Sequence, residues 1–138
     1  MGQVTFTSQP ERIEKYAEKV YHFLADLNNF QVMMPERVTL WESTTDTCSF
    51  TIKDMAKIEF KIRERVPFSK VVVDSAGETP LDFDLTAMIE EKETGSCEVI
   101  LELNADLSPM LKMIAGGPLQ TLVNTMNTKL REHFVKGL

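Results

Sequence analysis

The chain has 138 residues, 43 % of them hydrophobic, and its 15 Lys and Arg against 21 Asp and Glu give a formal net charge of −6. This length and composition are typical of one globular domain and exclude disordered, collagen-like and coiled-coil chains. The negative charge disfavours binding to nucleic acid, because phosphate contacts depend on Lys and Arg side chains that replace counterions.

The chain carries no signal for a membrane or for export. It has no stretch of about 18 uncharged apolar residues, so neither a transmembrane helix nor stable membrane insertion is expected. Its first residues lack the basic segment and apolar stretch of a secretory signal. Cys48 and Cys97 each stand in an alternating apolar run, which favours two buried thiols over a disulfide. We therefore expect a cytoplasmic protein.

The first elements are a strand and a pair of short helices. Thr, Val and Phe residues predict a strand over residues 3–15, bent at Pro10. Over residues 15–30, apolar side chains recur at intervals of three and four, which is typical of an amphipathic helix. Asn28 and Asn29 interrupt that pattern, and a short turn follows as far as Pro35.

From residue 36 to about residue 107 the hydrophobic period is two. The pattern predicts six antiparallel strands, each with one face in water, because the apolar residues alternate instead of running together. In the first of them, Val38 and Leu40 are expected to face inward, and Trp41 faces outward or marks a bulge. The strands are predicted near 38–43, 48–52, 55–66, 70–75, 81–90 and 96–107.

A long helix is predicted to close the chain, starting at Ser108-Pro109. Gly116-Gly117-Pro118 is expected to kink or break it. The segment 109–117 before that point is a lid over a cavity, a docking surface for a partner, or simply the first helical turns. Beyond it, apolar residues are expected to face the sheet: Leu119, Leu122, Val123, Met126, Leu130 and Phe134. Polar residues are expected to point away: Gln120, Asn124, Asn127, Lys129 and Arg131.

This order of elements resembles the START-like SRPBCC superfamily, whose helix-grip fold is shared with the birch-pollen allergen and with polyketide cyclases. The resemblance covers nearly the whole chain, and its clearest local piece is EKVYHFLADLNNFQVMMPERV. It implies an α+β domain over residues 1–138, with a curved seven-stranded antiparallel sheet around a long C-terminal helix and a short helix pair after the first strand. Met33-Met34 departs from the family's frequent aromatic residue before the proline. The family's pattern falls on Val20, Tyr21, Leu24, Asp26, Pro35 and Val38.

In that superfamily the space between sheet and helix is usually a hydrophobic cavity. The alternative is that the same side chains fill a solid core. The residues expected to line the cavity are Met34, Phe50, Ile58, Phe60, Ile62, Phe83, Leu85, Val99, Leu101, Leu119, Leu122, Val123 and Met126.

The resemblance implies binding of a hydrophobic small molecule, such as a lipid, an isoprenoid or a polyketide. Two alternatives stay open: an enzyme of the cyclase or aromatase kind, and a protein-interaction module with a filled core. Glu64 is the candidate catalytic residue, because its parity with Ile62 aims it at the concave side; otherwise it lies in solvent beside Pro67. No cofactor motif occurs, and neither His22 nor His133 has metal-ligand spacing.

Overall fold

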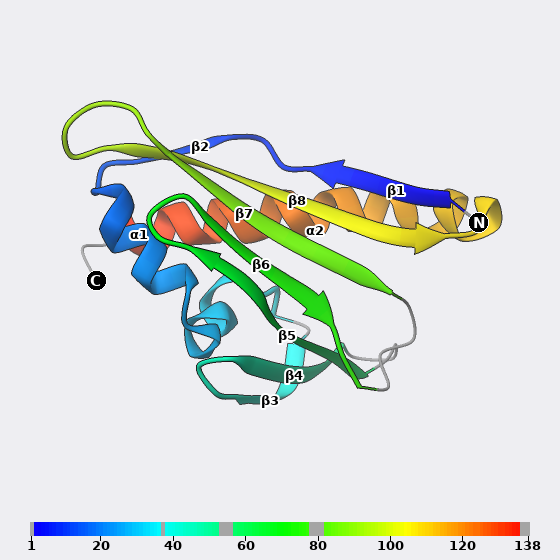
Figure 1. Cartoon of the computed structure of the whole chain (residues 1–138). Helices are drawn as coiled ribbons and strands as arrows, with labels where there is room; N and C mark the ends of the chain where they lie inside the picture. Colours follow the sequence, from blue (N-terminus) through cyan, green and yellow to red (C-terminus); the bar gives the residue numbers. More distant parts are fainter. Residues whose placement is uncertain (1, 37, 53–56, 78–81, 136–138) are drawn as a thin grey trace.

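The computed structural model describes residues 2–36, 38–52, 57–77 and 82–135, and in it an antiparallel sheet curves around one long helix (Figure 1). This architecture confirms the predicted α+β helix-grip fold. In chain order the elements are β1 (Gly2–Thr7), β2 (Glu11–Ile13), α1 (Ala17–Leu24), the 3₁₀ helix η1 (Leu27–Met33), β3 (Val38–Ser43), β4 (Thr47–Ile52), β5 (Lys57–Val66), β6 (Lys70–Ser75), β7 (Phe83–Glu91), β8 (Cys97–Leu107) and α2 (Pro109–Val135).

The sheet is a meander closed by its first strand, in the order β1-β8-β7-β6-β5-β4-β3. Each strand from β3 to β7 pairs with the next one in the sequence, whereas β1 lies at the far edge and pairs with β8, Gly2 opposite Leu107. The sheet has eight strands instead of the seven predicted, because the first strand is divided near Pro10. Its second part, β2, also pairs with β8.

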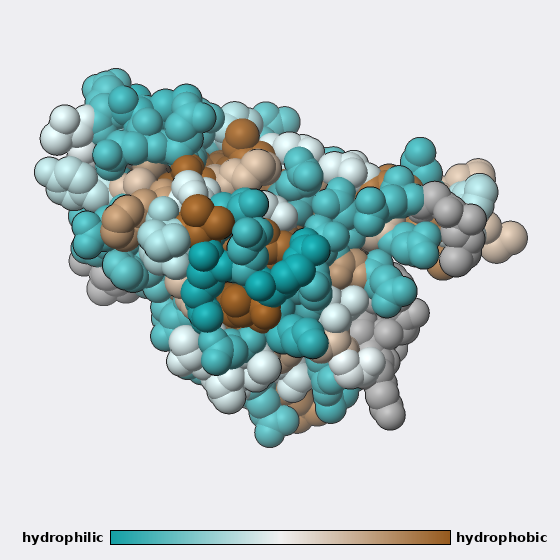
Figure 2. Space-filling view, in the orientation of Figure 1, coloured by the Kyte–Doolittle hydropathy of each residue, from teal (hydrophilic) through white to brown (hydrophobic). Residues whose placement is uncertain are grey.

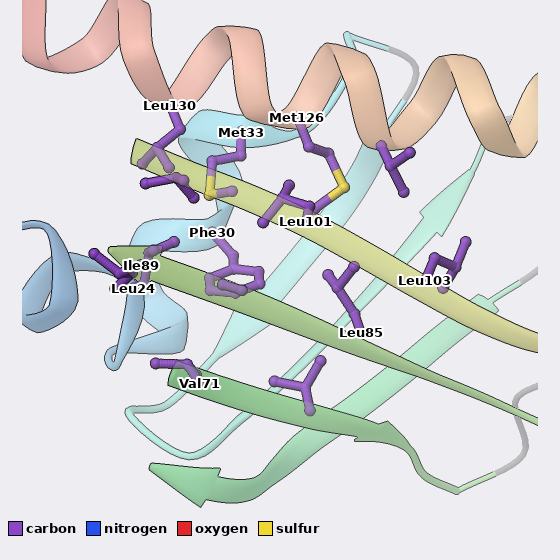
Figure 3. Packing of buried hydrophobic residues seen from close by; sticks show 14 of the residues in the cluster. Leu24, Phe30, Met33, Val71, Leu85, Ile89, Leu101, Leu103, Met126 and Leu130 are labelled. Atoms are coloured by element: carbon purple, nitrogen blue, oxygen red, sulfur yellow. The ribbon is translucent and has the colours of Figure 1, made fainter. Parts of the chain in front are cut away.

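The concave face of the sheet holds the core. Cross-strand partners such as Leu85 and Leu103 lie side by side there, and both are buried. From the helical side, Met126 and Leu130 of α2 and Met33 of η1 point to the same space (Figure 3). The apolar face of the strands and the apolar stripe of the last helix therefore pack against each other in one core layer.

The predicted break in the last helix is wrong. The helix runs unbroken from Pro109 to Val135, with Pro118 inside it. Proline at this position removes the hydrogen bond to the carbonyl of Ile114. Because Pro118 and Ile114 both lie on the exposed part of the helix, water can satisfy that carbonyl.

One polar residue of α2, Asn127, does not point away from the core as predicted. Asn127 is fully buried, and its amide nitrogen lies 3.1 Å from Ser8 Oγ and 2.9 Å from the carbonyl oxygens of Gln9 and Val99. One turn earlier, Asn124 accepts a hydrogen bond from the backbone N–H of Gln9 at 2.9 Å. Polar side chains of α2 thus attach the helix to the link between β1 and β2.

Leu40 does not face inward. The pairing of β3 with β4 shifts register between Thr39 and Glu42, and Leu40 has a positive φ of 53° with 77 % of its surface exposed. A bulge of this kind reverses which side chains face the core. Of the two possibilities for Trp41, the bulge is therefore the correct one.

Candidate functional site

The structure brings the thirteen predicted ligand residues together: twelve lie on the strands and α2, and Met34 directly follows η1. Every one of them belongs to the core cluster or packs against it. They divide by exposure, and the division matters because a ligand can reach only side chains that protein atoms do not cover fully. Eight are buried: Met34, Phe50, Phe60, Leu85, Val99, Leu101, Val123 and Met126. Five are partly buried: Ile58, Ile62, Phe83, Leu119 and Leu122.

The burial of the concave face is not uniform. Val99 and Leu130 are at most 1 % exposed, so the end near α1 is solidly packed. Toward the start of β1 the cover is less complete. Val4 and Phe83 lie opposite Ala105 from its two sides in the sheet, and both are only partly buried. Partly buried apolar side chains therefore lie at the strand ends beside β1, and two others, Ile58 and Ile62, lie on β5.

A row of aromatic rings crosses the concave face. Trp41 stacks on Phe50 with a centroid distance of 5.4 Å and an interplanar angle of 13°. Phe50 meets Phe60 edge to face at 5.9 Å, and Phe60 meets Phe83 edge to face at 6.3 Å. These spacings lie in the range that aromatic pairs prefer. We call Trp41, Phe50, Phe60 and Phe83 the aromatic row; it joins β3, β4, β5 and β7.

The 3₁₀ helix η1 packs against this row. Asp26 caps η1 by accepting a hydrogen bond from the N–H of Asn28 at 3.0 Å, which orients its apolar residues toward the sheet. Phe30 of η1 lies 5.7 Å from Phe60, and Met33 is fully buried beside it (Figure 3). Phe30 and Trp41 are not among the ligand residues predicted from the sequence. The bulge of β3 and the tight turn of η1 place them on this face, and neither is visible in the hydrophobic period.

Glu64 does not face the concave side. The pairing of β5 with β6 shifts register between Ile62 and Glu64, so strand parity is lost at that point. Glu64 lies opposite Val72, its side chain is 50 % exposed, and one oxygen lies 3.2 Å from Nζ of Lys70. The prediction of a concave carboxylate is wrong, and the solvent-exposed alternative is correct.

Arg65, the residue after Glu64, binds other segments of the chain through its guanidinium. Its guanidinium donates to the carbonyl oxygen of Ala25 from Nε (3.0 Å) and Nη2 (2.9 Å). The same Nη2 reaches the carbonyl oxygen of Thr45 at 3.1 Å and Oδ1 of Asp46 at 2.7 Å. Arg65 therefore ties the end of α1 to the turn between β3 and β4, which is a structural role.

The two cysteines are free and buried, as predicted. Burial raises the pKa of Cys48 well above its ordinary value. Burial, with a smaller effect of the Glu91 charge, raises the pKa of Cys97 from 9.0 to about 11. Both thiols stay protonated at neutral pH, so neither is an activated nucleophile. The described residues contain no group of three or more His, Cys, Asp or Glu side chains arranged to hold a metal ion.

The convex side carries a polar groove of about 530 Å³ over β4 and β5. Thr47, Ser49 and Lys61 are among the residues that line it. Oε1 of Glu59, one of the residues of the groove, lies 3.1 Å from Nζ of Lys57. Its Oε2 lies next to Gly77, where an added Cβ would stand 1.6 Å from that oxygen. Most of this lining is polar and comes from the outer face of the strands, so the concave face is the better candidate for an apolar ligand.

Comparison with family models and with curated protein sequences gives no match. Solved structures do match. The Bacillus cereus protein XoxI is 13 % identical, with a TM-score of 0.74 over 98 % of this chain and 96 % of that one. The di-domain aromatase/cyclase BexL of the BE-7585A biosynthetic pathway is 14 % identical, with a TM-score of 0.72 over 99 % of this chain and 47 % of that one.

A third similar structure is a point mutant of norcoclaurine synthase from Thalictrum flavum, in complex with a transition-state analogue. It is 11 % identical, with a TM-score of 0.66 over 96 % of this chain and 98 % of that one. At such identities the likeness is one of fold. The sheet order, the long closing helix and these neighbours together show that the chain has a helix-grip fold.

Proposed function

We propose that this protein binds a hydrophobic small molecule on the concave face, with the aromatic row as the main contact surface. The observation that carries the proposal is the row itself: four rings from four strands, with Phe83 at its partly buried end. A solid core does not require rings in series, whereas a flat or polyene-like ligand gains both area and ring contacts from them.

The partly buried aliphatic residues supply the rest of the surface. Ile58 lies opposite Phe50 in the sheet, and Leu119 and Leu122 of α2 pack on the same cluster. Burial of apolar area contributes about 25 cal/mol per Å² to binding. A ligand seated among these side chains would therefore be held by its shape and apolar area, with few polar contacts to orient it.

The cyclase alternative has less support. A cyclase folds a reactive chain and moves protons through a positioned acid or base. The carboxylate considered for this role, Glu64, points to the convex side and pairs with Lys70. Ligand binding without a reaction is therefore the function we favour. BexL and norcoclaurine synthase support a small-molecule role in general, since both names describe proteins that act on small molecules.

Trp41 gives a direct test, because it is the only tryptophan of the chain and it stacks on Phe50. We would titrate the protein with 2-naphthol and with decanoic acid and follow Trp41 fluorescence, after native mass spectrometry of freshly purified protein. We expect saturable quenching by 2-naphthol and a co-purified hydrophobic molecule.

Two variants separate the site from general hydrophobicity. Phe83→Gln removes a ring from one end of the row. The variant should need at least about ten times more 2-naphthol for half-maximal quenching. Ile114→Gln is the matched control, because Ile114 is 68 % exposed and belongs to no part of the concave face. Unchanged fluorescence with both probes and no co-purified molecule would refute the proposal; so would equal affinity of the two variants.

A further inference from the structure

The first turns of α2 carry an exposed apolar surface that the core does not use. Met110, Met113 and Ile114 are 71 %, 87 % and 68 % exposed, and Leu111 is 46 % exposed. We call these four residues the α2 patch. Figure 2 shows hydrophobic residues at the narrow end of the molecule, where α2 begins. Single exposed apolar residues are ordinary, but four within five consecutive positions point to a binding surface.

The α2 patch lies on the side of the helix opposite to the core stripe. Successive residues of an α-helix are rotated by about 100°. Ile114 and the buried Leu130 are sixteen positions apart, which places them about 160° from each other around the axis. On the sheet-facing side at this level, a Cβ at Gly116 would lie 3.9 Å from the ring of Phe6. The apolar stripe of α2 thus changes sides along the helix.

The charges around the patch are unlike those of the rest of the chain. Between Asp106 and Glu132 the sequence has no Asp or Glu, although the whole chain has 21 of them and a net charge of −6. Lys112 is the only charged residue from residue 107 to residue 128, and its eighteen-residue spacing from Leu130 places it on the side of the core stripe, away from the patch. An apolar helix surface without any charged side chain matches the interface of a phospholipid bilayer, where apolar side chains insert at the boundary between headgroups and acyl chains.

We propose that the α2 patch docks this protein on the surface of a phospholipid bilayer, without crossing it. A stable protein partner, or a second copy of this chain, needs about 800 Å² on each side and a complementary shape. Five residues of one helix offer less than that, whereas a bilayer accepts a small apolar wedge of any shape. None of the helices in the described ranges is apolar over a length that spans a bilayer, so contact would be with one leaflet.

This proposal does not depend on what the concave face binds. It is tested by flotation of the purified protein with vesicles of phosphatidylcholine and phosphatidylglycerol. We expect the protein to float with the vesicles, and Met113→Gln/Ile114→Gln to lower the bound fraction at least about tenfold. Val135→Gln is the matched control, because Val135 is an apolar residue of the same helix, 72 % exposed, at its other end. Its binding should equal that of the unmodified protein.

Three results would overturn the proposal: no flotation of the unmodified protein, equal flotation of the double variant, or an equal loss in Val135→Gln. Light scattering after gel filtration adds a further check. A dimer of the unmodified protein that the double variant abolishes would assign the patch to a second copy instead. All substituted side chains are exposed, so circular dichroism should show the same fold in every variant.

Discussion

Asn127→Leu should destabilise the protein by about 3 kcal/mol, far more than an ordinary polar substitution on a helix. The replacement keeps most of the volume but removes the amide nitrogen that lies within 3.1 Å of Ser8 Oγ and of the carbonyl oxygens of Gln9 and Val99. The residue is fully buried. Water therefore cannot take over its contacts, and the acceptors lose a donor in an apolar setting.

The magnitude follows from the donors and acceptors involved. An amide has two N–H groups, so at most two good hydrogen bonds are lost, each worth about 1 kcal/mol net. Carbonyl groups left without their donor add about 1–3 kcal/mol. One favourable change opposes this loss: Oδ1 of Asn127 is buried without a hydrogen-bond partner, and removing it recovers about 1 kcal/mol. The sum is about 3 kcal/mol, or a drop in Tm on the order of 10 °C.

The assay is urea unfolding followed by circular dichroism, with Asn124→Leu as the control. Asn124 sits one turn earlier and bonds the N–H of the same Gln9, but in an exposed setting, so its loss should cost at most about 1 kcal/mol. The m-value should not change, because the surface exposed on unfolding is nearly the same. If the two variants lose equal stability, the account of the buried amide is refuted.

Three further predictions concern Leu40, Arg65 and Cys97. Leu40→Asn should stabilise the protein by about 0.5–1 kcal/mol in urea unfolding, because the residue has a φ of 53° that Asn tolerates better; a loss of stability would contradict the strain. Arg65→Met should cost about 2 kcal/mol through its bonds to Ala25 and Asp46, whereas Arg63→Met, which breaks an exposed pair with Asp74, should cost under about 0.5 kcal/mol; equal losses would refute the contrast. Because burial raises the pKa of Cys97 from 9.0 to about 11, the protonated thiol stabilises the fold fully below pH 9, and this contribution is lost as the pH rises toward 11. The Tm should therefore fall less steeply with rising pH in Cys97→Ala than in the unmodified protein. Equal slopes for the two proteins would count against the buried thiol as the cause.

The parts of the fold that a repeating pattern specifies were predictable from the sequence. A period of two along β7 and β8 predicts alternating burial, and Leu85, Ala87, Leu101 and Leu103 are all on the concave face. The closing helix follows in the same way from its apolar spacing. These elements are regular, so each residue's face follows from its neighbours.

The errors fall where one residue interrupts that regularity. The bulges after Thr39 and Ile62 reverse parity, which turned Leu40 and Glu64 outward and brought Trp41 to the concave face. No turn residue marks either bulge in the sequence. Asn127 is a different case: its burial depends on the backbone of the β1–β2 link, more than one hundred residues away, and helical spacing carries no information about that partner.

The pairing of the first strand with the last one sets the order in which the protein can form. Residues of β1 find their partners on β8 only after about one hundred further residues have been made, as Gly2 opposite Leu107 shows. At 5–20 residues per second, ribosomal synthesis leaves β1 alone for roughly 5–20 s. Contacts so distant in sequence make folding slow. During this time the meander from β3 to β7 can already assemble, and β1 and α2 complete the domain last.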